Sequence, residues 1–355
     1  MRVVGAVAAT LAALASVAIG LPIAPGSVMA AEQSSGAAAP VAAPAPTPSP
    51  TTGQGTLTRV AGADRIATSV RISEVGFPNK LSATAVVLAR ADDFADELAG
   101  GPLAARFQGP LLLTPSAGLT DAVRLEIQRV LAVGHTVYLL GGTDAISANV
   151  GTSLQALGYN PVRVDGIDRY DTAVKIANIL GDPPTVFEVD GTNFPDGLSA
   201  GPAAALSHGV ILLTAGHVQA PETAQYLATH PKDVRYAIGG PAAAADPAAQ
   251  PLVGADRYAT SILVANQLFA SPSIVAIASG VAFPDALSGG ALAGIDGAPM
   301  LLVPSNVPLP ASMQSYFDRY SNTVQSAWLF GGTTAVSTPV AKAIAQALVL
   351  VPSAS

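Results

Sequence analysis

Short segments that are apolar at every position alternate with amphipathic segments along most of the chain. Residues 85–89 read Ala-Val-Val-Leu-Ala, and residues 111–113 and 137–140 are similarly apolar. A strand without polar positions is covered on both faces, which is typical of a parallel sheet between layers of helices. Asp64 can cap a helix that follows it, and residues 121–131 carry apolar side chains at helical spacing. The pattern therefore predicts an α/β fold of small, mainly parallel sheets flanked by helices.

A set of short motifs occurs three times in the same order, which indicates three tandem repeats. Each repeat opens with Gly-x-Asp-Arg, continues with Phe-x-Asp and a leucine-rich strand, and closes with a strand that ends in two glycines. We predict repeat 1 at residues 57–160, repeat 2 at 161–250 and repeat 3 at 251–351. The Asp-Arg pairs are Asp64-Arg65, Asp168-Arg169 and Asp256-Arg257, the Phe-x-Asp motifs begin at Phe94, Phe194 and Phe283, and the glycine pairs are 141–142, 239–240 and 331–332.

The spacing between repeats is unequal. Gly240 precedes the next motif glycine, Gly254, by 14 residues, whereas 24 residues separate Gly142 from Gly166. In repeat 1 this interval contains a helix-like stretch, and in repeat 2 it contains a run of alanines followed by Asp246 and a proline. The last helix of repeat 2 is therefore predicted to be cut short.

The N-terminus has the pattern of an export signal. Residues 3–23 are almost wholly apolar, and Val28-Met29-Ala30 is a small-x-small site of the kind that signal peptidase reads. We predict a signal peptide at residues 1–30, and an uncleaved membrane anchor is the alternative. Residues 31–56 are rich in alanine, proline, serine and threonine, which predicts an extended linker. The protein is thus expected outside the membrane, in the cell wall or the extracellular space.

Composition excludes several classes of protein. The formal charge is −7, and it becomes −8 without residues 1–30 because Arg2 is lost and no acidic residue is. An acidic chain without a basic cluster is not expected to bind nucleic acid. No later segment is apolar over the roughly 18 residues that a membrane span needs. The chain has no cysteine, so its stability depends on core burial rather than disulfides.

These motifs together resemble the cell-wall-binding repeat type 2 family. The family pattern comprises Gly-x-Asp-Arg-Tyr-x-Thr, Phe-Pro-Asp-Ala-Leu-Ser, a Leu-Leu-Thr run and a Gly-Gly strand end, and residues 283–288 match its centre completely. The resemblance covers about Arg59 to Val349. It implies a Toprim-like α/β fold for each repeat, a pseudo-threefold arrangement of the three, and non-covalent attachment to an anionic secondary polymer of a Gram-positive wall.

Repeats 1 and 3 depart from the family pattern at single positions. Ile66 stands where tyrosine is usual, and Ala95 replaces the proline of the central motif. An arginine precedes the opening motif of repeats 1 and 2, at Arg59 and Arg163, but Pro251 takes this place in repeat 3. If these arginines contact the polymer, the three sites are unequal.

The arginines are the leading candidates for polymer binding. An arginine at a helix start can offer paired donors to phosphate or carboxylate, and the helix N-terminus adds partial positive charge. Three copies around one axis would bind a polymer through several weak contacts at once. The alternative is that each motif aspartate caps its helix while the arginine pairs across the repeat interface. The candidates are Arg65, Arg169, Arg257, Arg59 and Arg163.

The aspartates of the central motifs, Asp96, Asp196 and Asp285, have two interpretations. Each follows a strand and precedes a helix, so it could cap that helix. It could also hold a divalent cation that bridges to an anionic polymer, and repeat 1 concentrates four carboxylates within residues 92–97. Apart from such a cation, no cofactor is expected.

Two other functions remain open. Residues 197–201 match the Gly-x-Ser-x-Gly pattern of serine hydrolases, with Ser199 as nucleophile, and histidines follow it in the chain. The repeats argue against this function, since Ala99 takes the serine position in repeat 1. The junctions between repeats could instead bind a small molecule or another surface protein. The sequence favours a secreted, non-catalytic protein that binds the cell wall.

Overall fold

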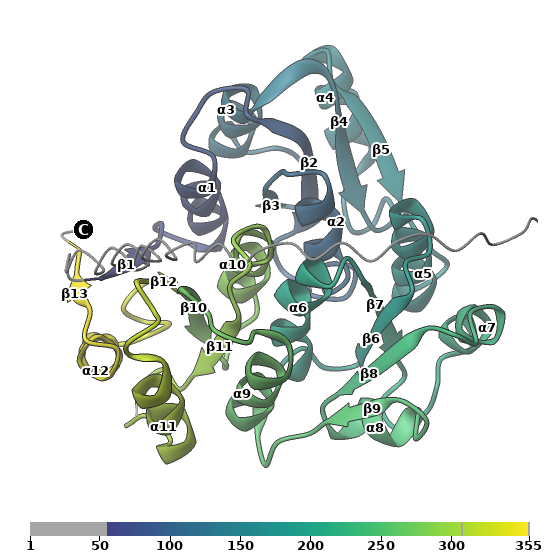
Figure 1. The fold of residues 1–355 in the computed structure, drawn as a ribbon. Helices are drawn as coiled ribbons and strands as arrows, with labels where there is room; N and C mark the ends of the chain where they lie inside the picture. The colour runs from purple at the N-terminus through teal and green to yellow at the C-terminus, as the bar shows by residue number, and fades with distance from the viewer. Residues whose placement is uncertain (1–54, 307, 354–355) are drawn as a thin grey trace, which may run out of the picture. The chain divides into compact units, whose positions relative to one another are not determined.

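The computed structural model describes residues 55–306 and 308–353, which fall within one structural unit, Thr52–Ser355. The predicted signal peptide and the linker up to residue 54 lie outside the described residues. Three separate sheets, each made of parallel strands, follow one another along the chain (Figure 1). The described helices include none that is both long and apolar enough to cross a membrane.

The three sheets share the order of four equivalent strands, and the third sheet has β13 as an additional edge strand. In repeat 1 the order is β3-β2-β4-β5, in repeat 2 it is β7-β6-β8-β9, and in repeat 3 it is β11-β10-β12-β1-β13. The strands of the first two sheets are β2 (Ala83–Arg90), β3 (Leu111–Thr114), β4 (Leu131–Leu140), β5 (Asn160–Val164), β6 (Thr185–Asp190), β7 (Val210–Thr214), β8 (Val234–Ile238) and β9 (Gln250–Leu252). Those of the third are β10 (Ile274–Ser279), β11 (Met300–Val303), β12 (Ser326–Phe330), β1 (Thr56–Val60) and β13 (Val351–Pro352). The predicted fold class, three tandem repeats with small parallel sheets between helices, is confirmed.

The strand before each Asp-Arg motif belongs to the sheet of the preceding repeat. β5 pairs with β4, and β9 pairs with β8. β1 pairs in the same way with β12 of repeat 3, so that Arg59 lies opposite Leu329. The predicted boundaries at residues 160 and 250 therefore fall in strands that complete the preceding sheet. The first strand of the described chain therefore joins repeat 1 to repeat 3 by strand pairing, so that the three repeats form a closed ring.

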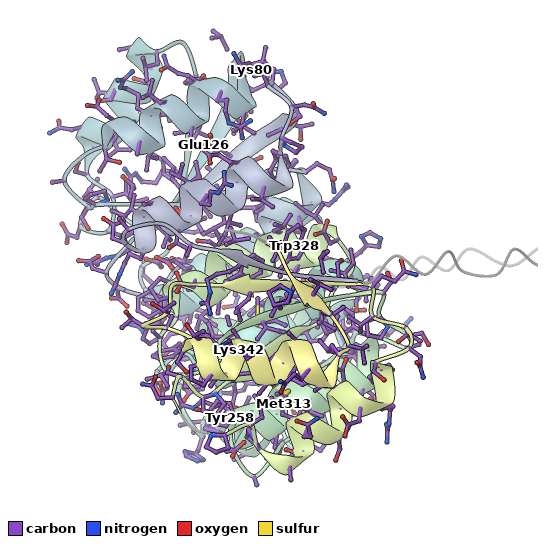
Figure 2. The ribbon with its side chains drawn as sticks, turned by 90° about the vertical axis from the view of Figure 1, so that its left-hand side faces the viewer. Lys80, Glu126, Tyr258, Met313, Trp328 and Lys342 are labelled. Atoms are coloured by element: carbon purple, nitrogen blue, oxygen red, sulfur yellow. The ribbon has the colours of Figure 1, made fainter. Side chains whose placement is uncertain are left out.

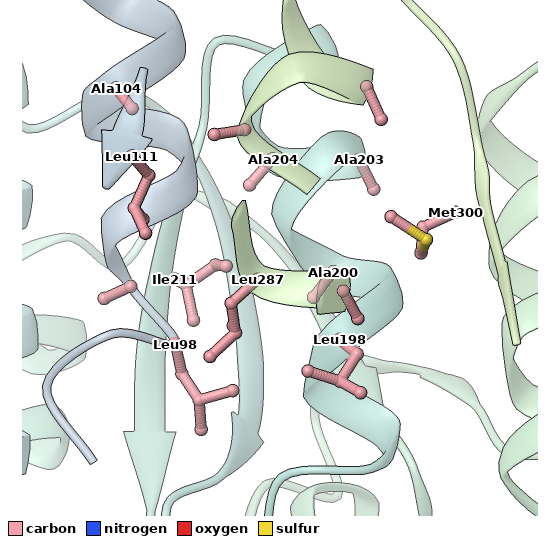
Figure 3. Close-up of a cluster of buried hydrophobic side chains, with 14 of the residues drawn as sticks. Leu98, Ala104, Leu111, Leu198, Ala200, Ala203, Ala204, Ile211, Leu287 and Met300 are labelled. Atoms are coloured by element: carbon pink, nitrogen blue, oxygen red, sulfur yellow. The ribbon is translucent and has the colours of Figure 1, made fainter. Parts of the chain in front are cut away.

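Three central helices, one from each repeat, pack against one another. They are α2 (Gly100–Arg106), α6 (Ala200–Leu206) and α10 (Pro284–Ile295). Their contact faces carry alanine and glycine, so the backbones approach closely, and a Cβ on Gly101 would lie 3.7 Å from the Cα of Gly201. Leucines that precede or follow these small residues fill the space around the helices (Figure 3). The largest hydrophobic core is therefore shared by all three repeats.

The start of the central helix differs among the repeats. In repeat 3 the helix begins at Pro284, directly after Phe283. In repeat 2 a 3₁₀ turn, η1 (Asp196–Ser199), precedes α6, and in repeat 1 the helix begins only at Gly100. In repeat 1 the expected helix after Asp96 is present, but it begins four residues later, at Gly100. Proline at the first helical position favours an early start, and repeat 1 lacks that proline.

The other helices lie on the sheet faces away from the shared core or between repeats. They are α1 (Arg65–Gly76), α3 (Asp121–Val130), α4 (Ala148–Ala156), α5 (Arg169–Leu180), α7 (Pro221–Thr229), α8 (Gly240–Ala245), α9 (Arg257–Leu268), α11 (Ala311–Tyr320) and α12 (Thr338–Ala347). α8 has six residues, whereas α4 has nine and α12 has ten. The predicted shortening of the last helix in repeat 2 is confirmed.

The short α8 leaves repeat 2 with a polar cluster in its outer layer. Glu188 on β6 takes the place of Leu88 and Ile277 in the other sheets, and all three are fully buried. The Glu188 carboxyl accepts a hydrogen bond from Gln219. Next to it, Asp246 forms an ion pair with Arg235 at 2.7 Å. Burial raises the pKa of Glu188 to about 8, and its hydrogen bond with Asp246 adds to the rise.

Candidate functional site

The opening motif of each repeat builds a helix start. Asp64 accepts a hydrogen bond from the backbone N–H of Ala67 at 2.8 Å, and Asp256 accepts one from Ala259 at 2.8 Å. Asp168 accepts from two backbone N–H groups of the first turn of α5. These carboxylates satisfy donors that the helix leaves free. The predicted capping role of the motif aspartates is confirmed.

The glycine and threonine of the motif hold the loop before the helix. The N–H of Gly62 donates to the hydroxyl of Thr68 at 3.0 Å, and the same bond joins Gly166 to Thr172 and Gly254 to Thr260. A Cβ on any of the three glycines would collide with the backbone of the following helix. The motif therefore needs a glycine because the loop lies against the backbone of the following helix. It needs a threonine because the hydroxyl accepts the hydrogen bond from the glycine N–H.

Each motif arginine reaches the end of a strand in its own repeat. One terminal nitrogen (Nη1) of Arg65 donates to the carbonyl of Ala91 at 2.7 Å, that of Arg169 donates to Gly191 at 2.7 Å, and that of Arg257 donates to Gly280 at 2.6 Å. Arg65 is exposed and the other two are half-buried. Within the part of the chain that the structure describes, none of the three forms an ion pair. Each guanidinium therefore keeps donors beyond the one that orients it.

The phenylalanines of the three central motifs meet in one ring, the Phe triad: Phe94, Phe194 and Phe283. Their ring centres lie 5.5, 5.7 and 5.9 Å apart, and the ring planes make angles of 60° to 63°. Edge-to-face contacts at such distances are favourable for aromatic pairs. The near equality of the three distances and angles marks the pseudo-threefold axis that relates the repeats.

Two motif arginines lie over the Phe triad. Arg169 of repeat 2 lies 5.6 Å from the ring centre of Phe94 in repeat 1. Arg65 of repeat 1 lies 5.7 Å from the ring centre of Phe283 in repeat 3. A guanidinium within about 6 Å of an aromatic face is attracted by the ring quadrupole. The arginines thus cross the repeat interface, as the alternative interpretation expected, but their partners there are aromatic rings rather than carboxylates.

The central aspartates lie at the same interfaces. Burial raises the pKa values of Asp96, Asp196 and Asp285, while a threonine hydrogen bond and an arginine of the following repeat oppose the rise. For Asp96 these partners are Thr172 and Arg169. On its other side, each aspartate lies so close to the first glycine of its own glycine pair that a Cβ there would collide with the carboxylate.

The helix-capping interpretation of these aspartates is therefore corrected. The helices that follow them have no side-chain cap, and α10 begins at the residue before Asp285. The carboxylates instead link the glycine turn of one repeat to the helix start of the next. The cation interpretation finds no ready ligand set, because no three carboxylates or histidines among the described residues cluster closely enough to hold a metal.

The acidic cluster of repeat 1 does not converge on one point. Asp92 pairs with Arg90 at 2.7 Å, and Asp93 lies 4.0 Å from the same guanidinium. Glu97 is fully buried, and neither of its carboxyl oxygens has a hydrogen-bond partner among the described residues. Burial, with added repulsion from Asp93 and Asp96, raises the pKa of Glu97 well above its ordinary value.

The two strand arginines hold glycine turns. Arg59 donates to the carbonyls of Gly331 and Val336 at 2.7 and 2.8 Å. Arg163 donates to the corresponding carbonyls of Gly141 and Ile146 at 2.8 and 2.7 Å. In repeat 2 the short α8 begins at once after Gly239, and the Gly239 carbonyl, which corresponds to those of Gly331 and Gly141, accepts a hydrogen bond from the N–H of Ala243. This difference explains why Pro251 can replace an arginine in the strand of that junction.

Ser199 does not have the surroundings of a hydrolase nucleophile. It is 1% exposed, and its hydroxyl donates to the carbonyl of Asp196 at 3.1 Å. Within residues 55–306 and 308–353, no histidine forms a hydrogen bond with it; His230, for example, bonds to Tyr226 and Thr229. The geometry does not support the serine hydrolase alternative.

One repeat junction has a pocket of about 200 Å³. It lies between repeats 2 and 3, and its lining includes Asp190, Asp196 and Arg257. Asp190 already accepts hydrogen bonds from Thr192 and from the N–H of Gly216. The pocket lies at the junction where Pro251 stands in place of the strand arginine.

Comparison with known proteins agrees with the repeat structure. Residues 59–151, 163–248 and 252–341 match the family described as Cell wall binding domain 2 (CWB2). The chain belongs to this family. The three CWB2 segments coincide with the three repeats, and membership assigns the chain a role in cell-wall binding.

Several known proteins contain a similar region. The chain is 25% identical over 300 residues to the N-acetylmuramoyl-L-alanine amidase LytC of Bacillus subtilis, covering 83% of the chain and 59% of that protein. It is 26% identical over 297 residues to the amidase enhancer of the same organism, covering 81% and 40%. The chain thus spans between 40% and 59% of the length of these relatives.

Solved structures share the fold. Cwp8 from Clostridium difficile superposes with a TM-score of 0.75 at 25% identity, covering 83% of the chain and 52% of Cwp8. Cwp6 from the same organism also gives a TM-score of 0.75, at 22% identity, covering 83% of the chain and 48% of Cwp6. The Cwp6 similarity concerns the fold alone.

Proposed function

We propose that this CWB2 chain is an exported, non-catalytic protein that attaches to an anionic polymer of the cell wall through its three motif arginines. The observation that carries the proposal is the arrangement of Arg65, Arg169 and Arg257 around one axis. Each guanidinium is oriented by a single carbonyl, and none forms an ion pair among the described residues.

The geometry suits a repeating anion. The remaining guanidinium donors form a planar fork that matches phosphate or carboxylate. Each arginine stands at a helix N-terminus, where the partial positive charge also favours an anion. A polymer that engages one site holds its next units near the other two, so modest affinities combine. The strand arginines Arg59 and Arg163 support the turns around this site, since their guanidinium groups are already bonded to carbonyls.

The acidic balance of the chain does not oppose this function at contact distance. Repulsion from the net charge is screened beyond about 8 Å at physiological ionic strength. The carboxylates of the central aspartates lie beside the arginines, so they reduce the local positive charge. A divalent cation that neutralises exposed carboxylates is therefore expected to strengthen binding to a polyanion.

A pull-down on purified Gram-positive walls tests the proposal. One portion of the walls is untreated, and another is stripped of secondary polymers with acid. We expect retention on untreated walls, stronger retention with added calcium, and loss of retention on stripped walls. Equal retention on stripped peptidoglycan would contradict an anionic polymer as the ligand. The same fractions, assayed for peptidoglycan cleavage, test the non-catalytic part of the proposal.

A further inference from the structure

A large pocket lies at the end of the central helices that faces away from the Phe triad. The triad precedes the N-termini of α2, α6 and α10, whereas the pocket is lined by the residues at their C-termini. Its volume is about 780 Å³. All three repeats contribute to it, through Arg106, Leu206 and Ile295 at the helix ends. Small-molecule sites commonly have volumes of roughly 300 to 1,000 Å³ and lie between domains.

Much of the pocket wall is apolar. Pro102, Ala105, Pro184, Leu206 and Ile295 line it, and Leu206 is 39% exposed despite its hydrophobic side chain. The helix ends that form its floor would normally present free carbonyl groups. Here the backbone turns back and satisfies them, with bonds from Gly109 to Ala104, from Gly209 to Ala204 and from Ala298 to Ala293 at 2.7 to 3.0 Å. These three carbonyl groups are therefore already bonded within the protein.

The polar groups at the pocket are basic or neutral. They are the side chains of Arg106, Gln108 and His208, and none of the described acidic residues lines the pocket. The amide of Gln108 already donates to the carbonyl of Ala105. Arg106 is exposed, and it forms no side-chain hydrogen bond or ion pair with the residues of 55–306 and 308–353.

We propose that this pocket binds a monoanionic amphiphile, whose acyl chain lies against the apolar walls and whose head group pairs with Arg106. The area of exposed leucine, isoleucine and proline supplies the hydrophobic contribution. The guanidinium supplies a charge-assisted hydrogen bond to a carboxylate or phosphate head. The site is separate from the motif arginines, so one chain can hold a wall polymer at one end of the axis and an amphiphile at the other.

The chain contains a built-in reporter for this site. Trp328 on β12 is the single tryptophan of the sequence (Figure 2). Its indole N–H donates to the carboxylate of Asp296 at 3.0 Å. Asp296 stands between Ile295 and Gly297, which both line the pocket. A ligand that displaces this segment is expected to change the emission of Trp328.

The test is a titration of the purified protein with decanoate below its micelle concentration, followed by Trp328 emission and by calorimetry. Decyltrimethylammonium, with the same chain and the opposite charge, is the ligand control. We expect saturable decanoate binding that weakens about tenfold in Arg106→Gln, as for loss of one charge-assisted hydrogen bond. Arg124→Gln, which removes a surface arginine paired with Asp121 on α3, is expected to bind decanoate like the unchanged protein.

A second variant tests the contribution of the apolar pocket surface to binding. Ala205→Trp fills the pocket and is expected to abolish binding, with a thermal melt that verifies the fold. Three results would overturn the proposal: no saturable binding of decanoate, equal affinity for decyltrimethylammonium, or equal affinities of Arg106→Gln and Arg124→Gln. Wall retention is expected to be unchanged in Arg106→Gln, so failure here is distinguishable from failure of the polymer site.

Discussion

The guanidinium of Arg169 in repeat 2 lies 5.6 Å from the ring centre of Phe94 in repeat 1. Arg65 and Phe283 form the same contact between repeats 1 and 3, which are the ends of the described chain. Each contact joins a candidate ligand-binding side chain to the shared aromatic centre. The same few residues therefore pack the repeats against one another and orient the arginines.

Replacing Phe94 by alanine is expected to weaken both stability and wall binding. The variant loses two edge-to-face contacts and the surface under Arg169. A large-to-small change at a packed aromatic costs about 3 kcal/mol of unfolding free energy. Phe107→Ala is the control, because Phe107 stacks on Tyr138 within repeat 1 and away from the arginines. Denaturant unfolding and wall pull-down measure the two effects; a Phe94→Ala variant that binds walls as well as Phe107→Ala would contradict the coupling.

The departure of repeat 1 from the family pattern at Ile66 is matched by a second change at Ala91, directly after the end of β2. The rings of Tyr170 and Tyr258 would lie 2.8 and 2.7 Å from a Cβ placed on Gly191 and Gly280. Repeat 1 has alanine at the equivalent place, Ala91, and the smaller Ile66 in place of tyrosine. The two differences compensate each other sterically.

This compensation predicts a double-mutant result. Ile66→Tyr alone is expected to cost about 1 to 3 kcal/mol, the usual range for overpacking. Addition of Ala91→Gly makes room for the ring and is expected to recover most of that loss. The unfolding free energies of the two single variants and the double variant measure the coupling. If the changes in unfolding free energy of the two single variants simply add in the double variant, the introduced tyrosine ring does not contact Ala91.

The first glycine of each glycine pair is expected to be far more sensitive than the second. Gly141 has φ of +86°, and a Cβ there would collide with Asp96. Gly142 has open space around its Cα. Gly141→Ala is therefore expected to cost at least 1 to 2 kcal/mol, the penalty of a left-handed backbone for other residues, while Gly142→Ala costs less. Thermal melts of the two variants give the comparison, and equal losses would argue against the contact with Asp96.

Stability is expected to fall as the pH rises from about 4.5 to about 8. The folded chain holds a proton on Glu188, whose pKa is raised to about 8, and the unfolded chain releases it near the ordinary value of 4.5. The folded state binds more protons in this interval, so the free energy of unfolding decreases with pH. Glu188→Gln keeps the hydrogen bond with Gln219 without titrating. Unfolding curves at several pH values are expected to show a smaller decrease for this variant, and parallel curves for both proteins would refute the assignment.

Features that depend on local chemistry could be predicted from the sequence. The aspartate caps, the continuously apolar strands and the short α8 all follow from side chains within a few residues of one another. The roles of Asp96 and Arg59 could not be predicted in the same way. Their partners, Thr172 and Gly331, lie close to them because a strand of one repeat completes the sheet of its neighbour. No local sequence pattern indicates this pairing between repeats. The paired change at Ile66 and Ala91 was a signal in the sequence that could have located a different contact, the one between the helix start and the strand end within repeat 1.

The most direct test of the account is a comparison of two triple variants in wall-binding affinity. Arg65→Gln, Arg169→Gln and Arg257→Gln together remove the three motif guanidinium groups. Arg71→Gln, Arg124→Gln and Arg319→Gln remove the same total charge from surface helices α1, α3 and α11. We predict a loss of more than about 100-fold for the first variant, because multivalent binding is lost, and a change within about twofold for the second. Equal affinities of the two variants for walls would contradict the central claim that the three arginines form the polymer site.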